Sequence, residues 1–558
     1  MLFDRLTIGI RPYLILSLVC LALYVPGLSS LSPLDRDESR FIQATRQMLE
    51  SGDFIRIRFQ EELRAKKPAG VYWLQAASVR ALSHPLSTQV WPYRLPGALA
   101  AWAAVLMTFA FGKGLLGTRP AFTGALLLAS ATILISEAHQ AKTDAVLLAC
   151  VVAAQGALGR MYVSSRAMAL SRGPVEQGQS SPPDLAETMT FWLAQGVGIL
   201  IKGPIVPVIS ILTILTLVIA DKSARWLLRL RPITGFILMT AVAAPWFVAV
   251  SQATDGAFVG AAIKSDLLPK LLGAQESHGG FPGLYLVLAI ALMWPGSLVI
   301  GPALLSVWGE RKRVVYRFLL AWAVPCWLMF ELVPTKLPHY VLPAFPAIML
   351  LAGARVCEGF EIGPKLWRSF YVVLWGAIGL GLAAACMILP VYFGPGLDLA
   401  VLPISVGIVL ATCLAGSLVI MGRYQMAVLA SVLAALVTWP PLLIRVAPEL
   451  EHLWVSNTVM QVLDSLAIQG PVASAGYGEP SLVFLLGTKT KLTDGGGAAL
   501  FLAEHRQSAA VVAAPERDSF LAQAKALGLD PKPLGDVHGL NYSRGKPVDL
   551  TIYGDLSP

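Results

Sequence analysis

Five of the six residues from Asp35 to Arg40 carry ionisable side chains, and they closely follow an apolar run long enough to enter a membrane. Asp37 and Arg40 are three positions apart, which makes them neighbours on one face of a helix. A carboxylate can take a proton or stabilise a developing positive charge, and a guanidinium can bind phosphate through two parallel hydrogen bonds. From this stretch alone, such chemistry and plain solvation of a helix end are equally good interpretations.

The same stretch predicts a helix that lies along the membrane surface. Asp35 and Glu38 have the spacing of a capping pair, with Asp35 as the N-cap and Glu38 at the third helical position. Gly52 is expected to end the helix. On this interpretation Asp35, Arg36 and Glu38 only cap and solvate an interfacial helix. Its apolar face, at helical spacing, consists of Phe41, Ile42, Thr45, Met48 and Leu49.

Other ionisable side chains occur in loops that the hydropathy pattern places on the same side of the membrane. Each alone could anchor a loop or extend its charge to water. Charged groups at membrane depth are costly, however, and commonly mark substrate paths. Their concentration on one face therefore indicates a site for an anionic lipid headgroup. They are Arg64, Lys66, Lys67, Asp144, Lys202, Glu331, Lys336, His339 and Tyr340.

The composition requires these loops to belong to a polytopic α-helical membrane protein. Of the 558 residues, 56% are hydrophobic and 14% are charged, whereas a soluble domain carries about 25% charged residues. Apolar runs of about 20 residues, the length of a spanning helix, recur along the chain. Lipid-exposed backbone must form its own hydrogen bonds, so each run is expected to be a helix. The thirteen predicted spans are 12–30, 93–115, 119–136, 143–162, 187–201, 204–221, 232–252, 282–306, 315–333, 339–356, 369–391, 400–421 and 426–445.

The distribution of charge sets the orientation and argues against a nucleic-acid partner. The formal charge of +9 comes from cations in short loops between apolar runs rather than from one basic patch. With thirteen spans these loops share the side of the N-terminus, which is therefore predicted to be cytoplasmic. The first loop, 31–92, and the loops with the ionisable groups then face the periplasm of a bacterial inner membrane. The first apolar run is expected to remain as a signal-anchor.

The remaining segments complete the predicted organisation. Segment 167–185, rich in Ser, Pro and Gly, predicts a flexible cytoplasmic loop. From residue 446 short apolar strands alternate with amphipathic helices. We therefore expect a transmembrane catalytic domain over 1–445 and a periplasmic α/β domain over 446–558. The six cysteines lie in or beside apolar runs without a C-x-x-C pair, which indicates packing rather than disulfide or metal chemistry.

The loop motifs resemble those of a known family. "DRDESRFIQATRQMLESGDF" followed by "RFQEELRAKKPAGVYWLQ" is similar to the first periplasmic loop of the bacterial aminoarabinose transferases, which belong to the protein mannosyltransferase-like, GT-C class of glycosyltransferases. The similarity continues through "KTDAVL", "GILIKGP", "APWFVAV" and "TKLPHYVLPAFPAI", and so covers most of the membrane portion. "GYGEPSLVFLLG" and "NYSRG" resemble an alphaproteobacterial branch of the family.

This resemblance implies transfer of one sugar from an undecaprenyl-phosphate-type donor to lipid A or a related lipid-linked glycan. The sugar would be of the aminoarabinose or galacturonic acid type, and the transfer would invert the anomeric centre. The catalytic carboxylates of the family correspond to Asp37 and Asp144. Its phosphate- and sugar-binding residues correspond to Arg40, Lys67, Lys336 and Tyr340, and Arg58, Lys202 and His339 are further candidates.

No metal or other cofactor is expected. The family often has a Glu before the Lys-Pro pair, and Lys66 stands at that position in this chain. A divalent metal of the kind seen near that carboxylate in some relatives would therefore lose a ligand.

The residue types leave alternatives for the mechanism and for the function. Cations would stabilise the departing lipid phosphate. Asp37 would act either as a base toward an acceptor hydroxyl or as a stabiliser of oxocarbenium character when the acceptor is an ionised phosphate. Transfer to a protein hydroxyl, as in protein O-mannosyltransferases, is the rival within the enzyme class. A lipid-sugar flippase is disfavoured, because it would need ionisable groups along the spans and on both sides.

Overall fold

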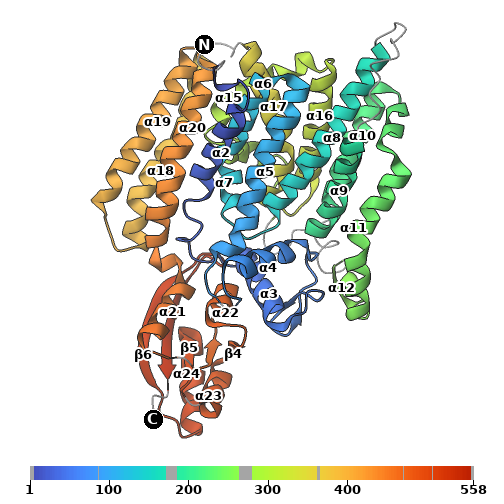
Figure 1. The fold of residues 1–558 in the computed structure, drawn as a ribbon. Coiled ribbons are helices and arrows are strands. Elements are labelled where there is room, and N and C mark those ends of the chain that lie inside the picture. Colours follow the sequence, from blue (N-terminus) through green and yellow to red (C-terminus); the bar gives the residue numbers. More distant parts are fainter. Residues whose placement is uncertain are drawn as a thin grey trace.

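The chain forms a large helical body and a smaller C-terminal part that contains a sheet (Figure 1). Most of the loop predicted at 167–185 lies outside the described residues, as does the segment 263–278, which contains His278. The residues that this computed structural model describes are 5–85, 87–170, 185–262, 279–360, 365–468, 470–505 and 507–554.

Each interval predicted to span the membrane contains a helix or two consecutive helices. Among the described residues, eight helices are each long and apolar enough to cross a membrane, and one pair with a 62° bend would add a ninth. The polytopic helical architecture is therefore confirmed, while the count of thirteen crossings stays a prediction. In chain order the helices are α2 (Arg11–Tyr24), α5 (Trp91–Leu116), the bent pair α6 (Thr118–Ala129) and α7 (Thr132–Ala138), α8 (Asp144–Leu170), α9 (Leu185–Lys202), α10 (Ile205–Asp221), α11 (Pro232–Ala253), α14 (Leu284–Leu292), α15 (Ser297–Leu305), α16 (Val314–Leu332), η4 (Pro338–Ala344), α17 (Phe345–Glu358), α18 (Lys365–Phe393), α19 (Leu402–Ile420) and α20 (Tyr424–Pro441).

The Gly203-Pro204 break separates α9 and α10, which form a tight antiparallel hairpin. The Nε2 atom of Gln195 on α9 donates a hydrogen bond of 2.7 Å to the Oγ atom of Ser210 on α10. In one continuous helix these residues would be about 22 Å apart along the axis. The hairpin leaves Lys202 at its tip.

The first long loop lies between the helical body and the C-terminal part (Figure 1). It contains α3 (Asp37–Ser51), the two-stranded hairpin β1 (Arg58–Phe59) and β2 (Glu62–Leu63), and α4 (Gly70–Leu82). Most of the predicted apolar face of α3 is buried, and α3 ends as predicted at Gly52, whose φ of +69° suits glycine. At Gly70 a Cβ atom would lie 2.7 Å from the backbone oxygen of Leu200, so this close approach of α4 to α9 requires a glycine.

The C-terminal part is built on a five-stranded mixed sheet of order β4-β3-β5-β7-β6. Strand β3 runs parallel to β4 and β5, while β7 is antiparallel to β5 and β6. Separate apolar clusters include α21 and α22 in one, and α23 and α24 in the other. The elements are α21 (Val455–Ser465), β3 (Val472–Ala475), α22 (Pro480–Leu486), β4 (Lys491–Thr493), α23 (Gly495–Glu504), β5 (Ala509–Ala513), α24 (Arg517–Ala526), β6 (Lys532–Asn541) and β7 (Lys546–Gly554).

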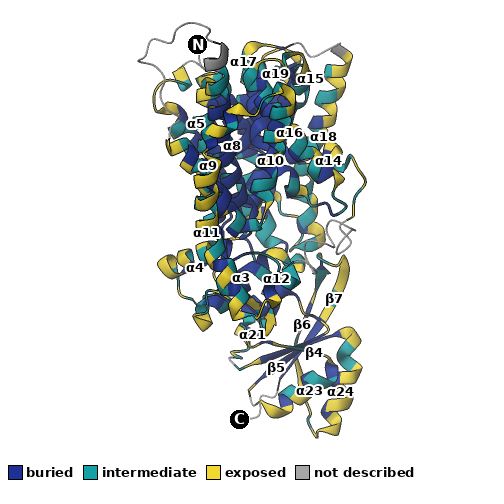
Figure 2. Cartoon of the chain, turned by 90° about the vertical axis from the view of Figure 1, so that its right-hand side faces the viewer, coloured by how far each residue is buried: buried dark blue, intermediate teal, exposed yellow. Residues whose placement is uncertain are grey.

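Buried residues fill the centre of the helical body (Figure 2). Helices α6 and α17 approach there through Gly124 and Gly353. A Cβ atom at Gly353 would lie 2.5 Å from the backbone oxygen of Pro120 and 2.7 Å from the backbone nitrogen of Gly124. Small residues of this kind let helix backbones pack closely in membrane proteins. This contact supports α7, which follows α6 and leads toward the cavity described below.

Substitution Gly353→Ala is expected to lower the melting temperature of the protein in detergent. The new methyl group meets backbone atoms that cannot move aside, and overpacking of this kind costs about 1–3 kcal/mol. Gly381→Ala is the matched control, because that glycine of α18 has no atom within 4 Å of its Cβ position. Equal melting temperatures for the two variants would contradict the close crossing.

Candidate active site

Five segments that are far apart in the sequence enclose a polar cavity of about 330 Å³ next to α3. Seven of the nine residues predicted to act on substrate line this central cavity, namely Asp37, Arg40, Lys67, Asp144, Lys202, His339 and Tyr340. Arg36, Arg64, Lys66, Lys142 and Thr335 line it as well. The sequence placed these side chains on one face of the membrane, and the fold brings them into one space.

Asp37 is the first residue of α3, and it is exposed to the central cavity. Burial alone would raise the pKa of its carboxyl group. The positive charges of Lys142, Arg64 and Arg40, together with the nearby His339 imidazole, outweigh this effect and hold the pKa of Asp37 below its ordinary value. Asp37 is therefore a carboxylate at neutral pH, surrounded by cations.

Asp144, in contrast, is buried and contacts basic side chains directly. Its Oδ1 atom lies 2.5 Å from the Nζ atom of Lys202 and 3.7 Å from the Nε2 atom of His339. The Lys202 ammonium also lies 5.2 Å from the centre of the Tyr340 ring. This arrangement makes Asp144 suited to orienting Lys202 and His339 toward the cavity.

Glu137, at the end of α7, joins the same network. Its Oε1 atom lies 3.0 Å from the Nζ atom of Lys142 and 3.6 Å from the Nδ1 atom of His339. Lys142 is thereby held in the wall of the central cavity. Neither Glu137 nor Lys142 was predicted as a site residue, although Lys142 lies two positions before Asp144.

Glu137, Asp144 and His339 offer ligand atoms that all lie within 4.8 Å of one another. Carboxylate and imidazole ligands suit several divalent metals. Lys142 and Lys202, however, already contact the carboxylate oxygens that a metal would need. The donor set therefore fits a metal poorly. The absence of a metal requirement stays a prediction.

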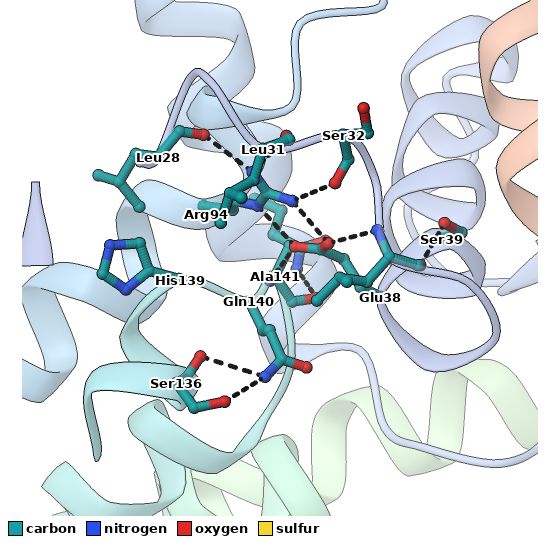
Figure 3. Close-up of polar contacts among 12 residues, drawn as sticks. Leu28, Leu31, Ser32, Glu38, Ser39, Arg94, Ser136, His139, Gln140 and Ala141 are labelled. Carbon is teal, nitrogen blue, oxygen red and sulfur yellow. Dashed lines mark hydrogen bonds and ion pairs between the residues drawn. The ribbon is translucent and has the colours of Figure 1, made fainter. Parts of the chain in front are cut away.

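A buried ion pair between Glu38 and Arg94 fixes the entrance to α3 (Figure 3). Arg94 of α5 has no exposed surface. Its Nε and Nη2 atoms each donate to Glu38 at 2.8 Å. Its remaining N–H groups donate to the carbonyl oxygens of Leu28, Leu31 and Ser32, at 2.8 to 3.0 Å.

The Glu38 carboxylate has two further partners, both of them backbone N–H groups. Leu34 donates to it at 2.9 Å, and Ala141 donates to it at 2.8 Å (Figure 3). Burial would raise the pKa of Glu38, but Arg94 and these donors hold it below the ordinary value. Glu38 thus ties the start of α3 to the loop at Ala141. Asp37 is the residue before Glu38, and Lys142 is the residue after Ala141, so this contact also fixes the positions of both cavity residues.

The capping role predicted for Asp35 and Glu38 is therefore wrong. The N-cap of α3 is Arg36, which makes no side-chain capping bond and has a φ of +64°. Asp35 instead contacts the C-terminal part, where the backbone N–H of Ser481 donates to its Oδ1 atom at 3.3 Å. The spacing assigned the carboxylates of Asp35 and Glu38 to the helix end, but they bind residues distant in the sequence, Ser481 and Arg94 respectively.

Lys336 and Arg58 do not line the central cavity. The Nζ atom of Lys336 donates to the carbonyl oxygens of Glu331 at 2.7 Å and Val333 at 3.1 Å, and lies 5.3 Å from the centre of the Tyr285 ring. Lys336 thus satisfies carbonyl groups at the C-terminal end of α16. Arg58 is an exposed residue of the β1–β2 hairpin. Both assignments placed the residue in the correct loop but not in the cavity.

An apolar groove of about 300 Å³ opens from the central cavity. The two spaces share Lys66, Lys67, Asp144, Lys202, His339 and Tyr340. The remainder of the groove is predominantly apolar and includes Pro68, Leu147, Phe247, Phe258, Phe330, Val333, Leu342 and Pro343. A ligand with a charged head and an apolar chain would fit this combination.

Comparison with known proteins identifies relatives in sequence, although no family model matches the chain. The undecaprenyl phosphate-alpha-4-amino-4-deoxy-L-arabinose arabinosyl transferase of Pectobacterium atrosepticum is 25% identical over 378 residues, which cover 66% of this chain and 64% of that protein. A second such transferase, from Pseudomonas fluorescens, is 28% identical over 330 residues, or 58% of this chain and 56% of the relative. The matched region thus spans less than two thirds of the length of these curated relatives.

Comparison with solved structures identifies the fold. ArnT from Cupriavidus metallidurans in the apo state superposes with a TM-score of 0.73 at 16% identity, covering 97% of both chains. The same protein bound to undecaprenyl phosphate gives 0.72. An oligosaccharyltransferase from Archaeoglobus fulgidus gives 0.50 at 11% identity and covers 94% of this chain and 69% of that one. The GT-C-type fold and the resemblance to the aminoarabinose transferases are confirmed.

Substitution Arg94→Leu is expected to destabilise the protein by about 3–5 kcal/mol, because it leaves the Glu38 carboxylate buried without its counter-ion. Arg445→Leu is the control. Arg445 pairs with Asp398 at 2.7 Å, but its side chain is 49% exposed, and exposed pairs contribute about 0–1 kcal/mol. Thermal unfolding in detergent checks the difference. Similar melting temperatures would show that the buried pair does not hold the loops together.

Proposed function

We propose that this chain is a GT-C glycosyltransferase of a bacterial inner membrane that transfers one sugar from a polyprenyl-phosphate donor to lipid A or a related lipid-linked glycan. The observation that carries the proposal is the central cavity, in which the Asp37 carboxylate faces several cations beside an apolar groove. The transferases of Pectobacterium and Pseudomonas, named for undecaprenyl phosphate-linked aminoarabinose, support the donor class. The sugar is proposed to be of the aminoarabinose or galacturonic acid type.

In the proposed complex the donor lies across the groove and the cavity. Its polyprenyl chain would pack against the apolar lining, which includes Phe247, Phe258 and Phe330. Its phosphate would meet Lys67 and Lys202, which line both spaces. A lysine ammonium binds phosphate as a point charge, and several of them can neutralise a departing phosphate. The sugar would then lie in the central cavity near Asp37.

The reaction follows from these positions. An oxygen of the acceptor attacks the anomeric carbon, and the bond from that carbon to the donor phosphate oxygen breaks. The polyprenyl phosphate leaves with the electron pair of the broken bond, and Lys67 and Lys202 stabilise its added negative charge. Direct displacement of this kind inverts the anomeric centre.

Asp37 has one of two roles in this scheme, depending on the acceptor. With a hydroxyl acceptor, its carboxylate takes the proton that the hydroxyl loses. With an ionised phosphate acceptor no proton is transferred, and the carboxylate stabilises the positive charge that develops at the anomeric carbon. The low pKa of Asp37 keeps it ionised for either role. Asp144 contacts Lys202 and His339 and would position them.

Two orientations of the molecule in the membrane would be compatible with an apolar helical body. We propose the one in which the central cavity and the C-terminal part face the periplasm, because the loops rich in Lys and Arg lie on the other side. Transfer to a protein hydroxyl remains the rival function. It predicts that deletion of the gene changes the glycosylation of periplasmic proteins rather than the mass of lipid A.

Substitution Asp37→Asn is expected to abolish sugar transfer, because the amide has nearly the same size but carries no charge and accepts no proton. Lys67→Ala is expected to reduce transfer strongly through loss of phosphate neutralisation. The measurement is mass spectrometry of lipid A from cells that express each variant, and from a deletion strain. Arg58→Ala is the control, since Arg58 lies outside the central cavity and is expected to leave transfer unchanged. Normal lipid A modification by Asp37→Asn would eliminate the mechanism.

Substitution Lys142→Met is expected to shift the acidic limb of the pH profile of kcat/KM toward higher pH. Lys142 is the strongest of the positive charges that lower the pKa of Asp37, so its removal raises that pKa. The active carboxylate is then lost at a higher pH as the solution is acidified. An acidic limb that stays in place would show that Asp37 is not the group that titrates.

A further inference from the structure

A second apolar groove, larger than the one beside the central cavity, lies along another face of α16. It has a volume of about 700 Å³. We name it the rear groove; residues of α14, α15, α16 and α17 line it together with Tyr371 of α18. Phe330 and Val333 line the first groove, whereas Trp327 and Leu328 of α16 line the rear groove. The described linings of the two grooves have no residue in common, so the rear groove is a separate space.

The rear groove has the length and the chemistry of a site for a lipid chain. On α16 its lining extends from Leu320 to Leu332, which corresponds to about 18 Å along the helix axis. The hydrocarbon of one leaflet is about half of a core of roughly 30 Å. The lining is predominantly apolar over this distance. An acyl chain from one leaflet therefore matches the rear groove.

The end of the rear groove nearer the central cavity disfavours an anionic headgroup. Glu331 is the only charged residue in the described lining, and it lies four positions before Thr335, which lines the central cavity. Its carboxylate accepts the backbone N–H groups of Gly283 at 3.0 Å and Tyr285 at 3.1 Å. Lys336 lies 3.6 Å from Glu331, but its ammonium group donates to backbone carbonyl oxygens and does not line the groove.

Two arginines lie near the opposite end of the rear groove, where Trp308 lines it. The guanidinium carbon of Arg311 lies 5.1 Å from the centre of the Trp308 ring, and its Nη1 atom donates to the Trp308 carbonyl oxygen at 2.9 Å. Arg368 is three residues before Tyr371 and so lies on the same face of α18. The Nε atom of Arg368 is buried and has no hydrogen-bond partner among the described residues.

The nearby carboxylates contact other arginines. Glu310 lies 2.8 Å from Arg313, and Glu358 lies 2.8 Å from Arg313 and 2.6 Å from Arg355. Within the part of the chain that the structure describes, neither carboxylate pairs with Arg311 or Arg368. This end of the groove therefore combines an interfacial tryptophan with two cations available to an anion, a combination typical of sites for anionic lipid headgroups.

We infer that the rear groove binds an anionic phospholipid of the leaflet opposite the central cavity, with an acyl chain along α16 and its phosphate at Arg311 and Arg368. On the orientation proposed above, this is the cytoplasmic leaflet. The inference goes beyond the proposed function and does not depend on it. Because α16 lines both grooves and leads to the loop with His339 and Tyr340, a lipid in the rear groove would support the wall of the donor groove from behind.

The test measures the melting temperature of the delipidated full-length protein in detergent as lipid is added. Dioleoyl phosphatidylglycerol is the anionic probe, and dioleoyl phosphatidylcholine is the control with the same chains and no net charge. A lipid that binds the folded protein raises its melting temperature. Phosphatidylglycerol is expected to do so saturably, with an apparent dissociation constant about fivefold or more below that of phosphatidylcholine. Equal constants for the two lipids would contradict recognition of an anionic headgroup.

Substitutions at Arg368 test the headgroup site. Arg368→Ala is expected to raise the dissociation constant of phosphatidylglycerol about tenfold, the loss typical of one charged hydrogen bond. Arg368→Lys is expected to retain part of the binding, because it keeps the charge. Arg225→Ala is the matched control, since this exposed arginine lies between α10 and α11, which do not contribute to the described lining. Unchanged binding by Arg368→Ala would overturn the inference.

A substitution in the groove tests the site of the chain while both arginines stay in place. Ala289 of α14 is half-buried and lines the rear groove, so Ala289→Trp is expected to fill it and abolish the saturable rise in melting temperature. Ala291→Trp is the control, because Ala291 is exposed on the same helix and does not line the groove. A full response of Ala289→Trp to phosphatidylglycerol would place the lipid elsewhere and refute the assignment.

Native mass spectrometry of the protein purified in mild detergent identifies the occupant. The expected result is one anionic phospholipid per chain, with lower occupancy in Arg368→Ala and Ala289→Trp. A polyprenyl phosphate lost in Ala289→Trp would assign the groove to a second molecule of that lipid, and a dimer without lipid would assign it to a second copy of the chain. Either result would overturn the inference. None of these measurements requires sugar transfer, so an inactive protein would count against the proposed function alone.

Discussion

The buried pair of Glu38 and Arg94 is the constraint on which the geometry of the active site depends. Taking two charges out of water is expensive, and the cost is offset only when every hydrogen-bonding group finds a partner. Here Arg94 donates to Glu38 and to three carbonyl oxygens, while Glu38 also accepts from two backbone N–H groups. The pair therefore joins the segment that follows α2, the start of α3 and the loop before α8. Asp37 and Lys142, which line the central cavity, are the sequence neighbours of Glu38 and Ala141, the two residues that this network connects.

The three spaces around α3 differ in the physical character of their linings. The groove is mostly apolar and the central cavity mixes carboxylates with cations. In the third space, between the first loop and the C-terminal part, the described lining residues include five cations and two carboxylates. The polyprenyl chain and the sugar of the proposed donor match the first two spaces. Lys66 lines all three. Lys66 thus places a positive charge where the linings of the three spaces meet.

The sequence predicted the membrane helices and most of the cavity because both leave strong local signals. Apolar runs locate spanning helices, and an ionisable group beside such a run, as at Lys202, is too costly to be accidental. Sequence position does not show which way a loop side chain points, and the Lys336 side chain turns to the carbonyl groups of α16 rather than to the central cavity. Glu38 was misread because its spacing also fits a capping pair. Arg94, inside a predicted span, carried a signal that could have identified its buried partner.

The backbone at Arg36 shows why the site needs both parts of the protein. A φ of +64° is costly for a residue with a side chain, and such strain persists only where the surroundings fix it. On one side of Arg36 the backbone N–H of Asp35 donates to Tyr542 and its carboxylate accepts from Ser481, both from the C-terminal part. On the other side Glu38 is held by Arg94 of the helical body. Asp37 lies between these anchors, so its direction into the cavity is set by the sheet-containing part and by the membrane helices together.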